Sequence, residues 1–233
     1  MIWSDSLVGL PTQTNWTWTD LTTVSGVAAG SGGGAELWRA NARTGQLLQR
    51  QVLSNVETQS GAVPSPRADW VSFSTSVPDF FGAAVTVSTA GARVSSGPQT
   101  QPVGWLPDGR FVFIRVASGA WTVEVRDPAR TDATVVGRFT DITDALAQPS
   151  ANVIVAHDIR TGRLWTIRGT TVTLVPQVLL PGGISLDSIS RDGRTLSFSE
   201  PGSGESERTG IVDLQTGAVT FMCDAGCLKL VIN

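Results

Sequence analysis

The sequence predicts an all-β fold, a β-propeller of four-stranded blades, and three observations lead to it. Pro66, Pro107, Pro149 and Arg191 mark four copies of a turn followed by an apolar strand, and neighbouring copies begin 41 or 42 residues apart. Each repeat contains four short strand patterns, and no segment has a convincing amphipathic helical pattern. Four strands in 40–45 residues are typical of a propeller blade. We therefore expect five blades in the 233 residues.

The repeated turns explain why each copy begins a hairpin. Asp108-Gly109 and Asp192-Gly193 suit a tight turn, because glycine adopts positive φ and aspartate can cap its own turn. The residues after each turn alternate, and the period of two places every second side chain on one face of a strand. These pairs are Val71 and Phe73, Val112 and Ile114, Ile154 and Ala156, and Leu196 and Phe198.

Two copies resemble a known repeat. They are Trp105-Leu106-Pro107-Asp108-Gly109-Arg110 with Phe113, and Ser190-Arg191-Asp192-Gly193-Arg194 with Phe198 followed by Ile211-Val212-Asp213-Leu214-Gln215-Thr216-Gly217. Both are similar to the TolB-like, WD-type propeller repeat, and the similarity covers roughly residues 20–222. This resemblance implies the propeller fold. It leaves function open, because the repeat occurs in binding proteins, scaffolds, sensor ectodomains and accessory domains of peptidases.

We expect one domain over residues 1–233, with closing segments at 1–18 and 223–233. The repeats are predicted at about 19–60, 61–100, 101–141, 142–183 and 184–222. The alternative is a propeller of six blades, with one blade shared by the two termini. Four tryptophans are expected to fill the space between blades: Trp38, Trp105, Trp121 and Trp165.

Composition excludes several classes of function. The net charge is −3 and the basic residues are scattered, which argues against a nucleic-acid partner. No apolar run approaches the roughly 20 residues of a membrane span, and the N-terminal residues do not form a signal peptide. One histidine and two cysteines cannot build a multi-histidine or four-ligand metal site. We therefore expect no metal, no cofactor and, without a Gly-x-Ser-x-Gly motif or other catalytic residues, no enzymatic function.

The candidate binding site lies on the longest predicted loops, which share one face of a propeller. Asp79, Phe80 and Phe81 form the first part, because adjacent phenylalanines in a loop suit a partner-binding anchor. Glu205 and Arg208, in a short acidic loop, form the second part. The alternatives are that the phenylalanines plug the channel or cover a blade, and that the acidic loop is merely solvated.

The two cysteines and the basic residues bear on location. Cys223 and Cys227 are candidates for a disulfide in an oxidising compartment, with two free thiols as the alternative. The single lysine among 17 basic residues is typical of a GC-rich bacterial genome. We therefore expect a monomer outside the cytoplasm, in the periplasm or at the cell surface.

The sequence is thus interpreted as a binding or scaffold propeller for a protein or peptide, part of a bacterial envelope or sensor protein. The alternative is a carbohydrate-binding or glycosidase-like propeller, which needs carboxylates directed into the central funnel. Four aspartates lie near predicted inner strands and none is in a catalytic motif: Asp20, Asp141, Asp144 and Asp187. His157 beside Asp158 could act in acid–base chemistry, although a structural histidine is the alternative.

Overall fold

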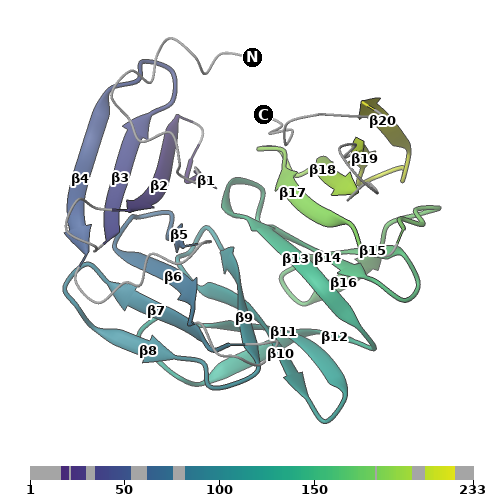
Figure 1. The fold of residues 1–233 in the computed structure, drawn as a ribbon, viewed down its shortest axis with the longest axis horizontal. Coiled ribbons are helices and arrows are strands. Elements are labelled where there is room, and N and C mark those ends of the chain that lie inside the picture. The colour runs from purple at the N-terminus through teal and green to yellow at the C-terminus, as the bar shows by residue number, and fades with distance from the viewer. Residues whose placement is uncertain are drawn as a thin grey trace. The chain divides into compact units, whose positions relative to one another are not determined.

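The structure is a computed structural model that describes residues 17–20, 22–29, 35–53, 62–75, 82–181, 183–200 and 208–223 (Figure 1). Within these ranges the chain forms twenty strands, β1 to β20, and one short 3-10 helix at Pro149–Ala151. The chain divides into two compact units. The first contains Met1–Arg115 and Val125–Thr134, and the second contains Val116–Glu124 and Val135–Asn233.

The strands form five four-stranded antiparallel sheets, and each sheet keeps its strands in chain order. The first sheet contains β1 (Thr17–Trp18), β2 (Thr23–Ala29), β3 (Ala35–Asn41) and β4 (Leu47–Leu53). The second contains β5 (Val63–Pro64), β6 (Trp70–Ser74), β7 (Ala84–Ser88) and β8 (Arg93–Ser95). The third contains β9 (Thr100–Trp105), β10 (Phe111–Ala117), β11 (Ala120–Arg126) and β12 (Ala133–Phe139).

The remaining two sheets belong to the second unit. The fourth sheet contains β13 (Ile142–Gln148), β14 (Val153–Asp158), β15 (Arg163–Arg168) and β16 (Thr171–Leu174). The fifth contains β17 (Ser185–Ile189), β18 (Thr195–Glu200), β19 (Arg208–Asp213) and β20 (Val219–Cys223). The all-β prediction of a propeller with five four-stranded blades is confirmed. Strand β1 comes from the predicted closing segments, whereas residues 224–233 lie outside the described ranges.

Hydrogen bonds between equivalent positions of consecutive blades reproduce the sequence period. In the first unit, the Trp105 indole Nε1 donates to the Val63 carbonyl, 42 residues earlier, at 2.9 Å. In the second unit, the Gln148 side-chain amide donates to the Ile189 carbonyl, 41 residues later, at 2.8 Å. The repeat therefore corresponds to a physical contact between neighbouring sheets, as stacking of blades requires.

The repeated turns have the predicted geometry. Gly109 and Gly193 have φ of +87° and +70°. In the fifth sheet, Ser190 Oγ donates to the Asp192 carboxylate at 2.6 Å, and the Arg194 backbone N–H donates to the same oxygen at 3.1 Å. The pKa of Asp192 lies below its ordinary value, because these two hydrogen bonds stabilise the ionised carboxylate and the Arg194 cation adds to them.

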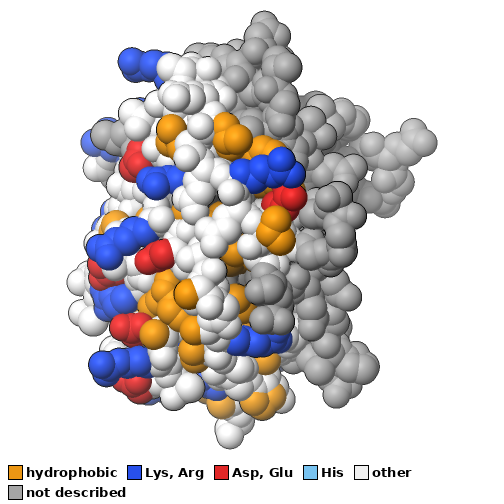
Figure 2. Space-filling model, turned by 90° about the vertical axis from the view of Figure 1, so that its left-hand side faces the viewer, with side chains coloured by type: hydrophobic (Ala, Val, Ile, Leu, Met, Phe, Trp, Pro, Cys, Tyr) orange, Lys and Arg blue, Asp and Glu red, His pale blue; other side chains and the backbone are white. Residues whose placement is uncertain are grey.

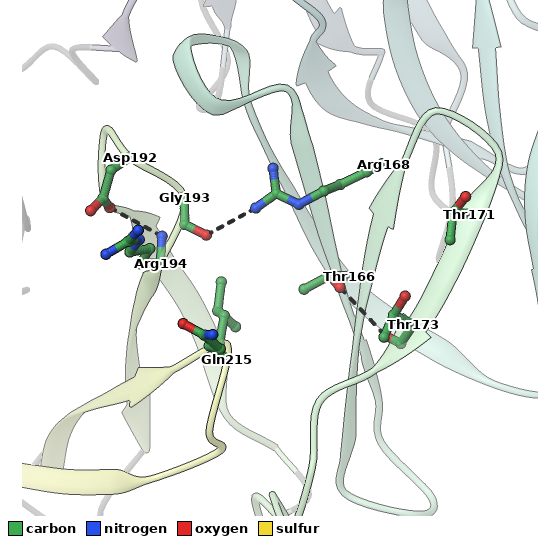
Figure 3. Close-up of a pocket in the computed structure, with 9 residues that line it drawn as sticks. Thr166, Arg168, Thr171, Thr173, Asp192, Gly193, Arg194 and Gln215 are labelled. Carbon is green, nitrogen blue, oxygen red and sulfur yellow. Dashed lines mark hydrogen bonds between the residues drawn. The ribbon is translucent and has the colours of Figure 1, made fainter.

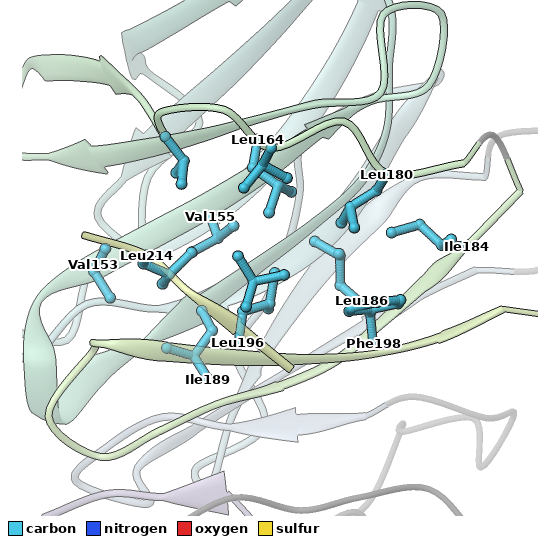
Figure 4. Packing of buried hydrophobic residues seen from close by; sticks show 13 residues of the cluster. Val153, Val155, Leu164, Leu180, Ile184, Leu186, Ile189, Leu196, Phe198 and Leu214 are labelled. Carbon is cyan, nitrogen blue, oxygen red and sulfur yellow. The ribbon is translucent and has the colours of Figure 1, made fainter. Parts of the chain in front are cut away.

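The second strand of each blade is buried more completely than period-two alternation predicts. Every residue of β14 is buried, as are the four central residues of β18. The reason is that a blade packs against a neighbour on both of its faces, so the strand near its centre has no solvent side. In the second unit a cluster of thirteen apolar residues, among them Val155, Leu164, Leu196 and Phe198, fills the space between the fourth and fifth sheets (Figure 4).

The four tryptophans lie in strands, as expected. Trp105 is 1% exposed and its ring lies 5.3 Å from that of Phe111, and Trp38 is also nearly buried. Trp165 packs edge-on against Phe139 at 6.0 Å. Trp38 and Trp105 are thus buried as a structural role requires, whereas Trp121 and Trp165 are only partly buried.

Candidate functional site

Most residues of the predicted binding site fall outside the described ranges. These are Asp79, Phe80, Phe81 and Glu205, together with Cys227 of the predicted disulfide. Cys223 ends β20, and its side chain is likewise outside the description. Arg208 is the exception, because it begins β19 immediately after residues 201–207. The structure therefore places one predicted binding residue and leaves the others as predictions.

Arg208 lies against an exposed aromatic ring. Its guanidinium carbon is 4.2 Å from the centre of the Phe221 ring, and Nη1 is 3.6 Å from the Glu200 carboxylate. Glu200 and Arg208 face each other across β18 and β19, so the ion pair forms where the two strands diverge. Phe221 also meets Phe198 edge-on at 5.9 Å, which holds its ring in place while 43% of the residue stays exposed. We call Arg208 and Phe221 the loop-end pair.

The sequence analysis did not identify Phe221 or its exposed apolar neighbours. Val219 and Met222 on the same strand are also exposed. The sequence did contain a signal for this surface. An outermost strand needs no apolar side chains on its solvent side, and β20 nevertheless carries several. In the first unit, the outermost strand β4 shows a similar feature, with Leu47, Leu48 and Val52 exposed.

Charges of both signs are mixed on the surface. Figure 2 shows one face, on which arginines and acidic side chains alternate with apolar groups and no single-sign patch dominates. This pattern agrees with the small net charge of −3. It favours short-range recognition over long-range electrostatic attraction of a highly charged partner.

A pocket of about 360 Å³ lies in the second unit, between the fourth and fifth sheets (Figure 3). One wall is the face of the β15–β16 hairpin that carries Thr166, Arg168, Thr171 and Thr173. The other wall comes from two turns of the fifth sheet and consists of Asp192, Gly193, Arg194, Leu214 and Gln215. We call this pocket the turn-end groove. It lies at the opposite end of the fifth sheet from Arg208, because β18 and β19 run between the two ends.

Arg168 bridges the two walls of the turn-end groove. Its Nη1 donates to the Ala151 carbonyl at 2.9 Å, and its Nη2 donates to the Gly193 carbonyl at 3.4 Å. Thr166 and Thr173 face each other across the hairpin, as do Arg168 and Thr171. The groove wall is therefore a ladder of hydroxyl groups that ends in a cation.

The four inner aspartates have partners within their own unit. Asp20 accepts hydrogen bonds from the backbone of Thr22 and Thr23, and Asp144 accepts one from the Leu186 N–H at 2.7 Å. Asp141 pairs with Arg160 at 2.9 Å, and Asp187 accepts a hydrogen bond from Ser199 at 3.1 Å. These contacts give each carboxylate a structural role in a turn or between strands.

His157 and Asp158 do not form an acid–base pair. His157 is fully buried, and neither ring nitrogen has a hydrogen-bond partner among the residues that the structure describes. Burial lowers the pKa of His157, and the Asp158 carboxylate only partly opposes this effect. Asp158 instead accepts the backbone N–H groups of Arg160 and Thr161 and caps the turn after β14. The pair is structural in this fold.

Within the described ranges, no three His, Cys, Asp or Glu side chains gather closely enough to hold a metal ion. In that same part of the chain, no helix is long and apolar enough to cross a membrane.

The fold is that of TolB-like propellers. No protein-family model and no curated protein matches the chain. A structure of TolB from Acinetobacter baumannii matches with a TM-score of 0.56 and 16% identity, over 87% of this chain and 53% of that one. A putative TolB from Agrobacterium tumefaciens matches with a TM-score of 0.61 and 16% identity, over 91% and 80%. The chain thus spans about half the length of the first TolB chain, and identities this low establish the fold alone.

Two other solved structures share the fold. A chain from a nidogen/laminin complex matches with a TM-score of 0.56 and 10% identity, over 89% of this chain and 77% of that one. An oligogalacturonate lyase in complex with manganese matches with a TM-score of 0.51 and 15% identity, over 88% and 63%. The lyase corrects our expectation that the protein is not an enzyme. That expectation relied on missing nucleophile and metal motifs, and a propeller with this fold is nevertheless a lyase. Enzymatic function is therefore open for this chain.

Proposed function

We propose that this chain is a β-propeller binding or scaffold domain whose partner is a protein or peptide. The loop-end pair is the observation that carries the proposal. Phe221 is a large, 43% exposed aromatic residue whose ring contacts Phe198 edge-on and the Arg208 guanidinium. Aromatic and arginine side chains held in this way dominate the binding energy of protein interfaces.

We propose that the predicted loop residues also contact the partner. Glu205 lies three residues before Arg208 in the sequence, and Asp79, Phe80 and Phe81 would form a second contact. The fold supports a protein partner, since one structure with the same fold comes from a complex of nidogen with laminin.

Comparing the peptide affinities of two variants tests the proposal. Peptides would be selected from a random display library on the immobilised protein, and their Kd values measured by calorimetry. Phe80→Ala combined with Phe81→Ala should weaken binding about 30-fold, the loss of one interface hot spot. Leu47→Ala is the control, because Leu47 is an exposed apolar residue at the start of β4 and is not among the predicted binding residues.

Stability measurements complete this experiment. Thermal unfolding of the double variant should match that of the wild-type protein. A large loss of stability with unchanged peptide affinity would place the two phenylalanines in the core, and the binding proposal would then be wrong. Phe221→Ala provides an independent test, since its ring lies in the described part of the site.

We also propose that the protein functions outside the cytoplasm, in a bacterial envelope or sensor protein. The resemblance to TolB structures from two bacteria supports this location. The proposed Cys223–Cys227 disulfide agrees with it, because disulfides persist in oxidising compartments. Thiol titration of the denatured, natively exported protein should detect no free thiol, and two reactive thiols would contradict the pairing.

A carbohydrate ligand is the second candidate function, and the match to an oligogalacturonate lyase favours it. A glycan array would detect binding, and mass spectrometry after incubation with oligogalacturonate would detect cleavage. Silence in both measurements would remove this candidate.

A further inference from the structure

The turn-end groove lies where the interface between the fourth and fifth sheets changes from apolar to polar side chains. The β15–β16 face that meets the fifth sheet begins with apolar residues, since Leu164 and Val175 are buried in the core cluster. Farther along the same face come Thr166 and Thr173, and then Arg168 and Thr171. Along β15, the interface is therefore closed by apolar contacts at the Leu164 end, and at the Arg168 end it opens into a polar pocket of about 360 Å³. That volume is within the range of small-ligand sites.

From this arrangement we propose that the turn-end groove binds the carboxylate groups of an acidic ligand. Arg168 stands in one wall and Arg194 in the other. Each guanidinium has five N–H donors in a fork that matches a carboxylate. Arg168 uses two of its nitrogens on the Ala151 and Gly193 carbonyls, which fixes its position and leaves donors for a ligand.

Arg194 is the more available of the two cations. Its guanidinium donates no hydrogen bond to any residue that the structure describes, and the residue is exposed. Two carboxylates lie near it, and each is occupied in a turn. Asp192 accepts from Ser190 and the Arg194 backbone, while Asp213 accepts the backbone N–H groups of Gln215 and Thr216. The turns therefore hold the Asp192 and Asp213 carboxylates in place beside the Arg194 guanidinium.

The rest of the groove also favours an anion with several acceptor groups. Three threonine hydroxyls and the Gln215 amide line it. Thr166 Oγ1 donates to the Thr173 carbonyl at 3.5 Å, and the other groups can donate hydrogen bonds to a ligand. The lining contains two arginines and one aspartate, and the Asp213 carboxylate also interacts with Arg194. A ligand with several carboxylates can engage both arginines at once.

This inference goes beyond the proposed function, because the groove and the loop-end pair lie at opposite ends of the fifth sheet. Two probes separate the possible sources of the carboxylates. Hexaglutamate represents an acidic peptide, and citrate represents a small polycarboxylate. Hexaglutamine, which has the same length and no charge, is the ligand control. Binding of each to the full chain would be measured by calorimetry at low and at physiological salt.

The informative variant is Arg194→Gln, with Arg163→Gln as its matched control. Arg163 is an exposed arginine of β15, and it points to the opposite face of that strand from Arg168. Loss of one charged hydrogen-bond donor should weaken carboxylate binding at least tenfold in Arg194→Gln and leave it unchanged in Arg163→Gln. Phe80→Ala with Phe81→Ala should not alter it.

Each outcome decides the question. Arg194-dependent binding of hexaglutamate supports the proposal with a peptide source, and Arg194-dependent binding of citrate supports it with a small-molecule source. If neither probe binds with Kd below about 1 mM, the proposal is wrong. It is also wrong if hexaglutamine binds as well as hexaglutamate, or if both arginine variants weaken binding equally.

Discussion

Arg126 is a buried cation, and no carboxylate among the described residues is hydrogen-bonded to it. Replacing it by methionine should strongly destabilise the first unit. The residue is 2% exposed, and burial lowers its pKa to about 10, so it remains protonated at neutral pH. Its Nε donates to Ser96 Oγ at 3.0 Å, and Nη2 donates to Thr86 Oγ1 at 3.1 Å and to the Val94 carbonyl at 3.3 Å. Its Nη1 donates to three carbonyls of the following turn, those of Asp127, Pro128 and Arg130.

The expected loss of stability follows from these acceptors. Methionine fills a similar volume and keeps the apolar contact with the Phe111 ring, which lies 5.0 Å from the guanidinium carbon. It cannot donate, so the acceptors around it lose their partner. The Pro128 carbonyl keeps a second donor, because Thr86 Oγ1 donates a hydrogen bond to it at 2.8 Å. Taking two or three acceptors as unsatisfied, at 1–3 kcal/mol each, we expect a loss of about 3–5 kcal/mol.

Urea and thermal unfolding followed by tryptophan fluorescence would measure this loss. For a chain of this size, about 3–5 kcal/mol corresponds to a decrease in Tm of roughly 6–20 °C. Arg126→Lys should have an intermediate effect, because it keeps the charge and loses the planar fork. Arg130→Gln is the control, since the side chain of Arg130 is exposed and only its carbonyl takes part. A loss below about 1 kcal/mol for Arg126→Met would refute the view that this hydrogen-bond network holds the second and third sheets together.

Three further predictions concern single positions. The pKa of His157 is lowered, so unfolding exposes a stronger base; stability should fall as the pH drops below about 6.5, and His157→Leu should flatten urea midpoints between pH 7.5 and 5.5. Gly217→Ala should cost several kcal/mol more in thermal unfolding than Gly91→Ala. Both glycines have positive φ, but a Cβ at 217 would overlap a backbone carbonyl and one at 91 meets nothing. Trp105→Phe should lower stability by about 1–2 kcal/mol in urea, because its hydrogen bond to Val63 is lost, and an unchanged midpoint would contradict this.

The features that recur with the period of the sequence were the ones that could be predicted. The Asp-Gly turns have the required positive φ, and a strand follows each of them as predicted. From the sequence, residues 141–147 could form one short helical turn, although they stand where an innermost strand is expected, and the structure has strand β13 at Ile142–Gln148. Pairing with β14 along its whole length outweighs the weak local preference of the alanines and Leu146.

The candidate sites could be predicted only in part, because most of their residues lie where the copies differ, although Asp192, Gly193 and Arg194 of the turn-end groove belong to the repeated turn. A period identifies what each blade shares, whereas Phe221 and the threonine ladder belong to single blades. Arg126 shows the same limit, since its acceptors are mostly backbone carbonyls, which no sequence pattern displays. The prediction that functional residues lie on the long loops also overlooked the turn-end groove, which is formed by the short hairpin turns.

The turn-end groove follows from a packing constraint that the fold imposes on every blade. Strands in a propeller sheet twist relative to one another, so two neighbouring sheets do not stay equally close along the whole length of their strands. A blade can close the resulting gap with large apolar side chains or leave it open. Between the fourth and fifth sheets, Phe198 and Leu164 fill one part of the interface, whereas threonines and two arginines line the part towards the turns. Arg168 holds the two walls together through the Ala151 and Gly193 carbonyls, which is a structural role. Arg194 makes no such hydrogen bond among the described residues, so the Arg194→Gln measurement separates a role in ligand binding from a role in stability.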